Sequence, residues 1–249
     1  MDSIDIDCRC NCGARMVARY FYKAIRCLFF KARLRGRANL PSDEPVIMVA
    51  NHVGSFGPVS VITSVPLRLY PWVAHEVTDL KTAAPRIQQE FIEQELHLRP
   101  PFSAWLGRVV GRICVALMRD IGAIPVYQKS KMIKATVLQS IALLKQGKNI
   151  LVFAEDSTRK INDVLCEFCT GFIHVARLYY QETKKAVQFL PIAVNRHAGA
   201  IRVGKPIRFD AHVPFGLEKH RLKSELETSV MSLYEEMEPR SARRGLRPA

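Results

Sequence analysis

Short apolar runs alternate along this chain with longer segments of helical periodicity. Val46–Ala50 and Ile150–Ala154 are continuous apolar runs rich in β-branched residues, which predict buried strands. Further strands are expected at 72–75, 122–126 and 187–194, and paired short strands at 200–209. Helices are expected at 14–35, 83–98, 102–119, 130–146, 171–182 and 217–237. Alternating strands and helices predict an α/β fold with a mostly parallel central sheet flanked by helices.

Two of the expected helices, 14–35 and 102–119, combine apolar residues at helical spacing with interleaved basic side chains. Such helices suit an anionic membrane surface, and the other interpretation is a helix packed on the core with a solvated basic face. We therefore divide the chain into a tail with a basic amphipathic membrane-surface helix (1–35) and an α/β domain (36–249). No secretory signal and no apolar run long enough to span a bilayer is visible. These features predict a peripheral or monotopic protein on the cytoplasmic face of a membrane.

The charge balance restricts the partners of the protein more than its fold. The 249 residues include 37 lysines and arginines against 23 acidic residues, a net charge of +14. This excess attracts nucleic acid, anionic lipid, or a soluble anion such as a coenzyme A thioester or an acidic carrier protein. The cations are spread through amphipathic helices and no nucleic-acid-binding module is recognisable, so nucleic acid is not expected. The seven cysteines match no zinc-ligand spacing, so no metal is expected.

His52 is the side chain best placed for chemistry. It directly follows the strand expected at 46–50, with Asn51 before it and a turn containing glycine and serine after it. Ligands of open α/β sheets bind at the carboxyl ends of the strands, where His52 is expected. A neutral imidazole can take a proton from a hydroxyl near neutral pH, as acyl transfer from a thioester to an alcohol requires. A lone histidine is otherwise more often structural.

Four short motifs follow one another along the chain: Asn51-His52, Gly122-x-Ile124-Pro125, Phe153-x-Glu155 and Leu190-Pro191. In order and spacing they resemble the four blocks of the glycerophospholipid acyltransferases, a family that includes lysophosphatidic acid acyltransferase. The stretch from Gly171 to Ala176 also resembles the glycine-led helix that follows the third block. The resemblance covers residues 45–210 and implies a glycerolipid acyltransferase-like fold.

The resemblance also implies a mechanism and a set of site residues. In the family, a histidine is the base for the acceptor hydroxyl, which attacks an acyl thioester, and an aspartate five positions later holds the imidazole. The second and third blocks bind the glycerol phosphate, and the proline of the fourth shapes the floor of the site. Carried over to this chain, the base is His52, and the substrate-binding residues are Lys129, Glu155, Asp156, Ser157 and Arg159. The donor, acyl-coenzyme A or an acyl-carrier protein, is a co-substrate, and no bound cofactor is implied.

Three of the four blocks depart from the family pattern. Gly57 stands where the family has the aspartate, and Gln128 stands where it usually has the second-block arginine. In the third block three residues are replaced, and Arg159 comes one position late. Arginine binds phosphate through paired hydrogen bonds, so a weaker clamp leaves open an acceptor without a terminal phosphate, such as another lysolipid or a lipid amine.

The missing aspartate bears directly on activity. In a serine protease, neutralising the equivalent aspartate lowers turnover roughly ten-thousandfold because the imidazole adopts the wrong tautomer. A backbone carbonyl can orient the ring instead, or another carboxylate can reach it; the candidates are Glu76, Asp79, Glu155 and Asp156. Asp156 is an acid gained in the loop expected to face the same cleft, and its other interpretation is a helix cap or turn residue.

Two hypotheses follow from the sequence. The first is an O-acyltransferase of phospholipid biosynthesis that acylates 1-acyl-glycerol-3-phosphate or a related lysophospholipid at a membrane surface. The second is a catalytically impaired relative that binds lipid or acyl chains without turnover.

Overall fold

The computed structural model describes residues 32–94, 96–127, 132–160 and 165–238. Its strands are β1 (Arg33–Arg35), β2 (Val46–Ala50), β3 (Leu69–Ala74), β4 (Ile124–Val126), β5 (Asn149–Phe153), β6 (Glu155–Lys160), β7 (Cys166–Phe168), β8 (Gln188–Asn195), β9 (Ala200–Val203) and β10 (Ile207–Arg208). Its α-helices are α2 (Phe56–Ser64), α3 (Leu80–Ile87), α4 (Phe102–Ile121), α5 (Ile133–Lys145), α6 (Ile173–Thr183) and α7 (Phe215–Met237). Short 3-10 helices cover Arg37–Asn39 and His75–Thr78, and a π-helix covers Gln88–Glu93.

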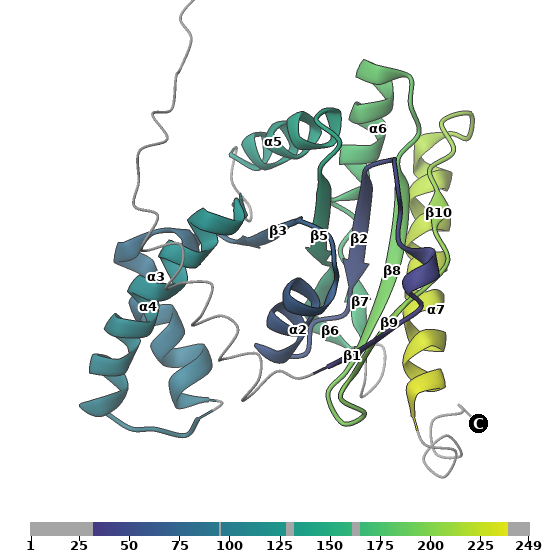
Figure 1. The fold of residues 1–249 in the computed structure, drawn as a ribbon. Coiled ribbons are helices and arrows are strands. Elements are labelled where there is room, and N and C mark those ends of the chain that lie inside the picture. The colour runs from purple at the N-terminus through teal and green to yellow at the C-terminus, as the bar shows by residue number, and fades with distance from the viewer. Residues whose placement is uncertain (1–31, 95, 128–131, 161–164, 239–249) are drawn as a thin grey trace, which may run out of the picture.

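The central sheet has the strand order β1-β9-β8-β2-β5-β3-β4 (Figure 1). Parallel pairs join β2 to β5 and β8, β3 to β4 and β5, and β1 to β9, whereas β9 and β10 run antiparallel to β8. The prediction of an α/β fold with a mostly parallel sheet flanked by helices is confirmed. β2 lies between β5 and β8, and all of its residues are buried. This central place explains its uninterrupted apolar sequence.

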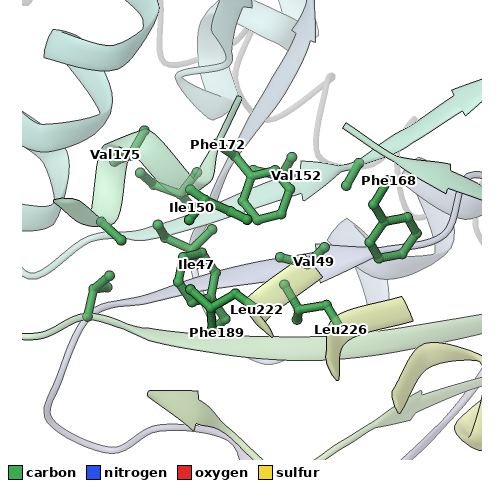
Figure 2. Packing of buried hydrophobic residues seen from close by; sticks show 14 of the residues in the cluster. Ile47, Val49, Ile150, Val152, Phe168, Phe172, Val175, Phe189, Leu222 and Leu226 are labelled. Carbon is green, nitrogen blue, oxygen red and sulfur yellow. The ribbon is translucent and has the colours of Figure 1, made fainter. Parts of the chain in front are cut away.

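Alternate residues of β2 pack against different layers of helices. Ile47 and Val49 point into the larger core, where they meet Leu226 of α7 together with residues of α5 and α6 (Figure 2). Met48 points to the opposite face and packs in a second cluster with Phe56 of α2. Because successive strand residues point to opposite faces, a strand covered on both sides needs an apolar residue at every position.

Helices α3 and α4 lie side by side beyond the β3–β4 end of the sheet and have a small core of their own (Figure 1). Glycines allow their close approach. A Cβ on Gly107 would lie 2.9 Å from the Cβ of Gln88, and one on Gly111 would lie 3.0 Å from the Cα of Ala84. In the part of the chain that the structure describes, no helix has the length and apolar content to cross a membrane.

Two expected helices differ from the structure. Residues 33–35, the end of the helix expected at 14–35, form β1 and pair with β9, while residues 14–31 lie outside the described residues. The helix expected at 83–98 begins at Leu80 and changes at Gln88 into the π-helix. In the first case a pairing partner far along the chain supplies backbone hydrogen bonds, which local periodicity does not encode.

The expected strands also need two corrections. The paired strands expected within 200–209 do not pair with each other, because β9 and β10 both pair with β8. The segment after Ala154, expected as a loop, is β6, which forms an antiparallel two-stranded sheet with β7. This hairpin stands next to the carboxyl end of β5, where the candidate site lies.

Candidate active site

Asn51 fixes the point where β2 delivers His52 to the carboxyl edge of the sheet. It is 1% exposed, and its side-chain amide bonds to the backbone of Val194 on β8 in both directions. Asn51 Oδ1 accepts from the N–H of Val194 at 2.7 Å, and Nδ2 donates to its carbonyl oxygen at 3.0 Å. This amide therefore joins the ends of two neighbouring parallel strands. The motif contained Asn51, but its sequence alone did not indicate this partner.

His52 is exposed at this edge, and its ring lies against Phe153. The two ring centroids are 5.5 Å apart and the ring planes meet at 83°, an edge-to-face arrangement. Phe153 is the last residue of β5, the strand that pairs with β2. The structure thus makes Phe153 a wall for the imidazole, a role that the sequence alone did not indicate.

Glu155 uses both carboxylate oxygens to hold main-chain N–H groups. One oxygen accepts from the N–H of His52, and the other accepts from the N–H of Cys166 at 2.7 Å. Burial raises the pKa of the Glu155 carboxyl group, and the hydrogen bonds from Cys166 and His52 oppose that shift. Glu155 therefore ties the turn that carries His52 to the β6–β7 hairpin. Its expected contact with substrate stays a prediction.

Asp156 is in a different environment from its neighbour in sequence. It lines a surface hollow with Glu167 of β7 and with Lys219 and Lys223 of α7, and the lining of this hollow does not include His52. It lies in strand β6, so the alternative of a helix cap or turn residue is wrong. The structure groups Asp156 with α7, and an orienting contact with His52 stays a prediction.

The remaining residues expected to bind substrate are only partly described. Ser157 and Arg159 both lie on β6, so the hairpin carries them past the end of β5. Their side chains, like all of Lys129, fall outside the described part of the structure. Their roles in binding the acceptor stay predictions.

Two other acidic residues considered as substitutes for the missing aspartate have partners of their own. In Glu76, Oε1 lies 3.1 Å from Nη1 of Arg86, and Oε2 lies 3.1 Å from Nδ1 of His75. Asp79 is the N-cap of α3, where its side chain accepts from the N–H of Lys81 at 2.9 Å. These contacts engage both carboxylates in the connection from β3 to α3.

Gly57, where the family pattern has aspartate, is the buried second residue of α2. A Cβ here would lie 3.5 Å from the carbonyl oxygen of Asn51, 3.7 Å from Cε1 of Phe153 and 3.9 Å from the carbonyl carbon of His52. All three are ordinary contact distances, so the local packing does not require a glycine. The position still faces the turn that carries His52.

The arrangement supplies an exposed imidazole on the rigid end of a central strand, with an aromatic wall and a fixed backbone. Such a group can accept a proton from a bound hydroxyl. Among the residues that the structure describes, no three histidine, cysteine, aspartate or glutamate side chains gather as metal ligands would.

The structure resembles the crystal structure of the 1-acyl-sn-glycerophosphate (LPA) acyltransferase PlsC from Thermotoga maritima. The TM-score is 0.50 at 14% sequence identity, and the match covers 90% of this chain and 83% of that chain. At this identity the likeness shows a shared fold, so the expected acyltransferase-like fold is confirmed. No protein-family model and no curated protein matches the chain.

Proposed function

We propose that this chain is an acyltransferase that moves a fatty acyl group from a thioester to the hydroxyl of a lysophospholipid-type acceptor, such as 1-acyl-glycerol-3-phosphate. The observation that supports this most directly is His52, exposed at the carboxyl end of β2 in a fold shared with an LPA acyltransferase. The donor in this proposal is acyl-coenzyme A or an acyl-carrier protein. The reaction would contribute to phospholipid synthesis on the cytoplasmic face of a membrane.

In the proposed reaction, neutral His52 accepts the proton of the acceptor hydroxyl while the hydroxyl oxygen attacks the carbonyl carbon of the thioester. The tetrahedral intermediate then collapses: the C–S bond breaks, the new C–O bond remains, and His52 returns the proton to the leaving sulfur. Asn51 and Glu155 hold the backbone on either side of the imidazole. The ring of Phe153 lies edge-to-face against one side of the imidazole.

For the acceptor, we assign headgroup contacts to residues of β6 and to Lys129, which precedes α5 in the sequence. Arg159 and Lys129 provide the positive charge that a phosphate needs, and Ser157 provides a hydroxyl group. Glu155 contributes indirectly, because its carboxylate holds the hairpin that carries two of these residues. If this assignment is correct, Arg159→Gln raises the KM for lysophosphatidic acid more than the KM for a lysolipid without a phosphate monoester.

The proposal is tested with the full chain, liposomes, a panel of acyl-coenzyme A and acyl-carrier-protein donors, and several lysolipids. The acylated lipid is measured by mass spectrometry. His52→Ala should lower the rate by roughly a hundred- to ten-thousandfold, the usual contribution of a general base. His212→Ala is the matched control, because His212 is also exposed but follows β10, which pairs with the opposite end of β8. Equal rates in wild type and His52→Ala would refute the proposal.

A second candidate is a relative that binds lipid or acyl chains without turnover. Gly57 favours it, because the position that faces His52 carries no carboxylate and Glu76 and Asp79 are engaged elsewhere. This candidate predicts lipid binding that survives His52→Ala and no acylated product from any pair of donor and acceptor.

A further inference from the structure

The face of α4 turned away from α3 exposes large apolar side chains. Phe102, Trp105 and Val109 are 52%, 56% and 36% exposed. Their spacing of three and four residues puts them on one side of the helix, and the rings of Phe102 and Trp105 stack with centroids 5.8 Å apart. Isolated exposed apolar residues need no explanation, whereas a contiguous apolar row on successive turns marks a contact surface.

The packing of α4 fixes this face outward. Ser103, Gly107, Gly111 and Val115 recur every four residues and form the buried side of the helix. The near-contacts of the two glycines with α3 leave no room for a larger side chain. Rotating the helix to hide Trp105 would replace these small residues with bulky ones, so the apolar row stays exposed.

A row of arginines runs beside the apolar row. Arg108 and Arg112 are one turn apart and exposed, and Arg119 follows on the same side two turns later. Within the described residues, neither Arg108 nor Arg112 forms an ion pair with a carboxylate. Their charges are therefore available to an anionic partner.

We propose that this face of α4, defined by Phe102, Trp105, Arg108, Val109 and Arg112, docks on a bilayer that contains anionic lipid. The guanidinium groups of the arginines would pair with lipid phosphates. The aromatic rings would enter the bilayer at the level of the lipid headgroups, where tryptophan is enriched in membrane proteins. A lipid surface offers the negative charge and the apolar layer that this face requires together. The choice of a bilayer as occupant rests on the proposed function, whose acceptor is a membrane lipid.

The tryptophans of the chain allow a direct test. The sequence has two, and the other, Trp72, is partly buried and donates its indole N–H to Ser140 at 2.9 Å. The full chain is mixed with vesicles of phosphatidylcholine and phosphatidylglycerol in equal amounts, with brominated acyl chains as quenchers. We expect quenching of the tryptophan emission, and we expect Trp105→Phe to abolish it while vesicle binding persists.

Charge is tested in the same vesicles by sedimentation. The double variant Arg108→Gln/Arg112→Gln should bind about fivefold more weakly for each arginine removed. The matched control is Lys185→Gln/Lys205→Gln, which removes two exposed cations elsewhere and should bind as wild type does. Replacing phosphatidylglycerol by phosphatidylcholine should weaken vesicle binding by the wild type. It should also reduce the difference in binding between the wild type and the arginine variant.

Three results would overturn the docking proposal. They are vesicle-bound wild type without quenching of Trp105, equal weakening by the arginine and lysine variants, and a concentration-dependent blue shift of Trp105 without vesicles, which would assign the face to a second copy or another protein. Quenching requires no catalysis, so His52→Ala should be quenched like wild type. A failure of the proposed enzyme activity therefore leaves this test intact.

Discussion

Gly57→Asp places a carboxylate where this site lacks one. A Cβ at position 57 makes only ordinary contacts, the closest at 3.5 Å from the carbonyl oxygen of Asn51 and another at 3.9 Å from the carbonyl carbon of His52. The new side chain thus begins beside the residue whose imidazole it is meant to orient. We predict that Gly57→Asp raises the acyl-transfer rate.

Two opposing contributions determine how Gly57→Asp changes the free energy of unfolding. Position 57 is in the first turn of α2, where a negative charge is favourable by about 0.3–1 kcal/mol. Partial burial of the carboxylate opposes this gain, so the free energy of unfolding should change by only about 1 kcal/mol. For the rate, the upper limit is the roughly ten-thousandfold effect of an orienting aspartate in a serine protease. Glu155 and Phe153 already constrain His52, so we expect a gain in rate well below that limit but still at least about tenfold.

The assay compares wild type, Gly57→Asp and Gly57→Asn with the best donor and acceptor from the panel. Gly57→Asn is the matched control, since it has the same size without the charge. The acylated lipid is quantified by mass spectrometry, because the seven cysteines of the chain would react with a thiol reagent. A folded Gly57→Asp protein no faster than Gly57→Asn would refute the reasoning, as would a gain that persists after His52→Ala.

Three further predictions concern stability and are measured by urea unfolding. Asn51→Ala should lower the free energy of unfolding by about 3 kcal/mol, since it leaves the N–H and C=O of Val194 unpaired in buried surroundings; a change within error would contradict this. Glu155→Ala should cost about 2 kcal/mol by removing the acceptor of two main-chain N–H groups. Burial raises the pKa of Glu155 above its ordinary value of 4.5, so its stabilisation is complete below that pH and declines as the pH rises through the raised pKa. The free energy of unfolding lost in Glu155→Ala should therefore be larger near pH 4.5 than at neutral pH. A larger loss at neutral pH would contradict the raised pKa of Glu155. Gly107→Val should destabilise by about 1–3 kcal/mol through overpacking, whereas Gly171→Ala, whose Cβ would meet nothing within 4 Å, should be nearly neutral.

Local sequence determined the elements whose signal is contained within one segment. β2 and the middle of β5, Ile150–Val152, are buried on both faces, so each of these positions must be apolar and the runs can be recognised without knowing their neighbours. α4 ends at Ile121, and the next residue, Gly122, has the φ of 71° that suits a helix C-terminus; this glycine was visible in the sequence. The place of His52 after β2 followed from the same logic, because strand ends are where α/β sheets present ligands.

Tertiary structure alone decided the features that depend on distant partners. Residues 33–35 become a strand only because β9 lies beside them, and Asn51 has a role only because Val194, 143 positions away, brings an unpaired backbone edge to it. Periodicity reports which face of an element is apolar, but not which remote segment will cover it. The same limit applies to α4, whose sequence showed an apolar and basic helix. Only the packing of its glycines against α3 determined that the aromatic and arginine rows face outward.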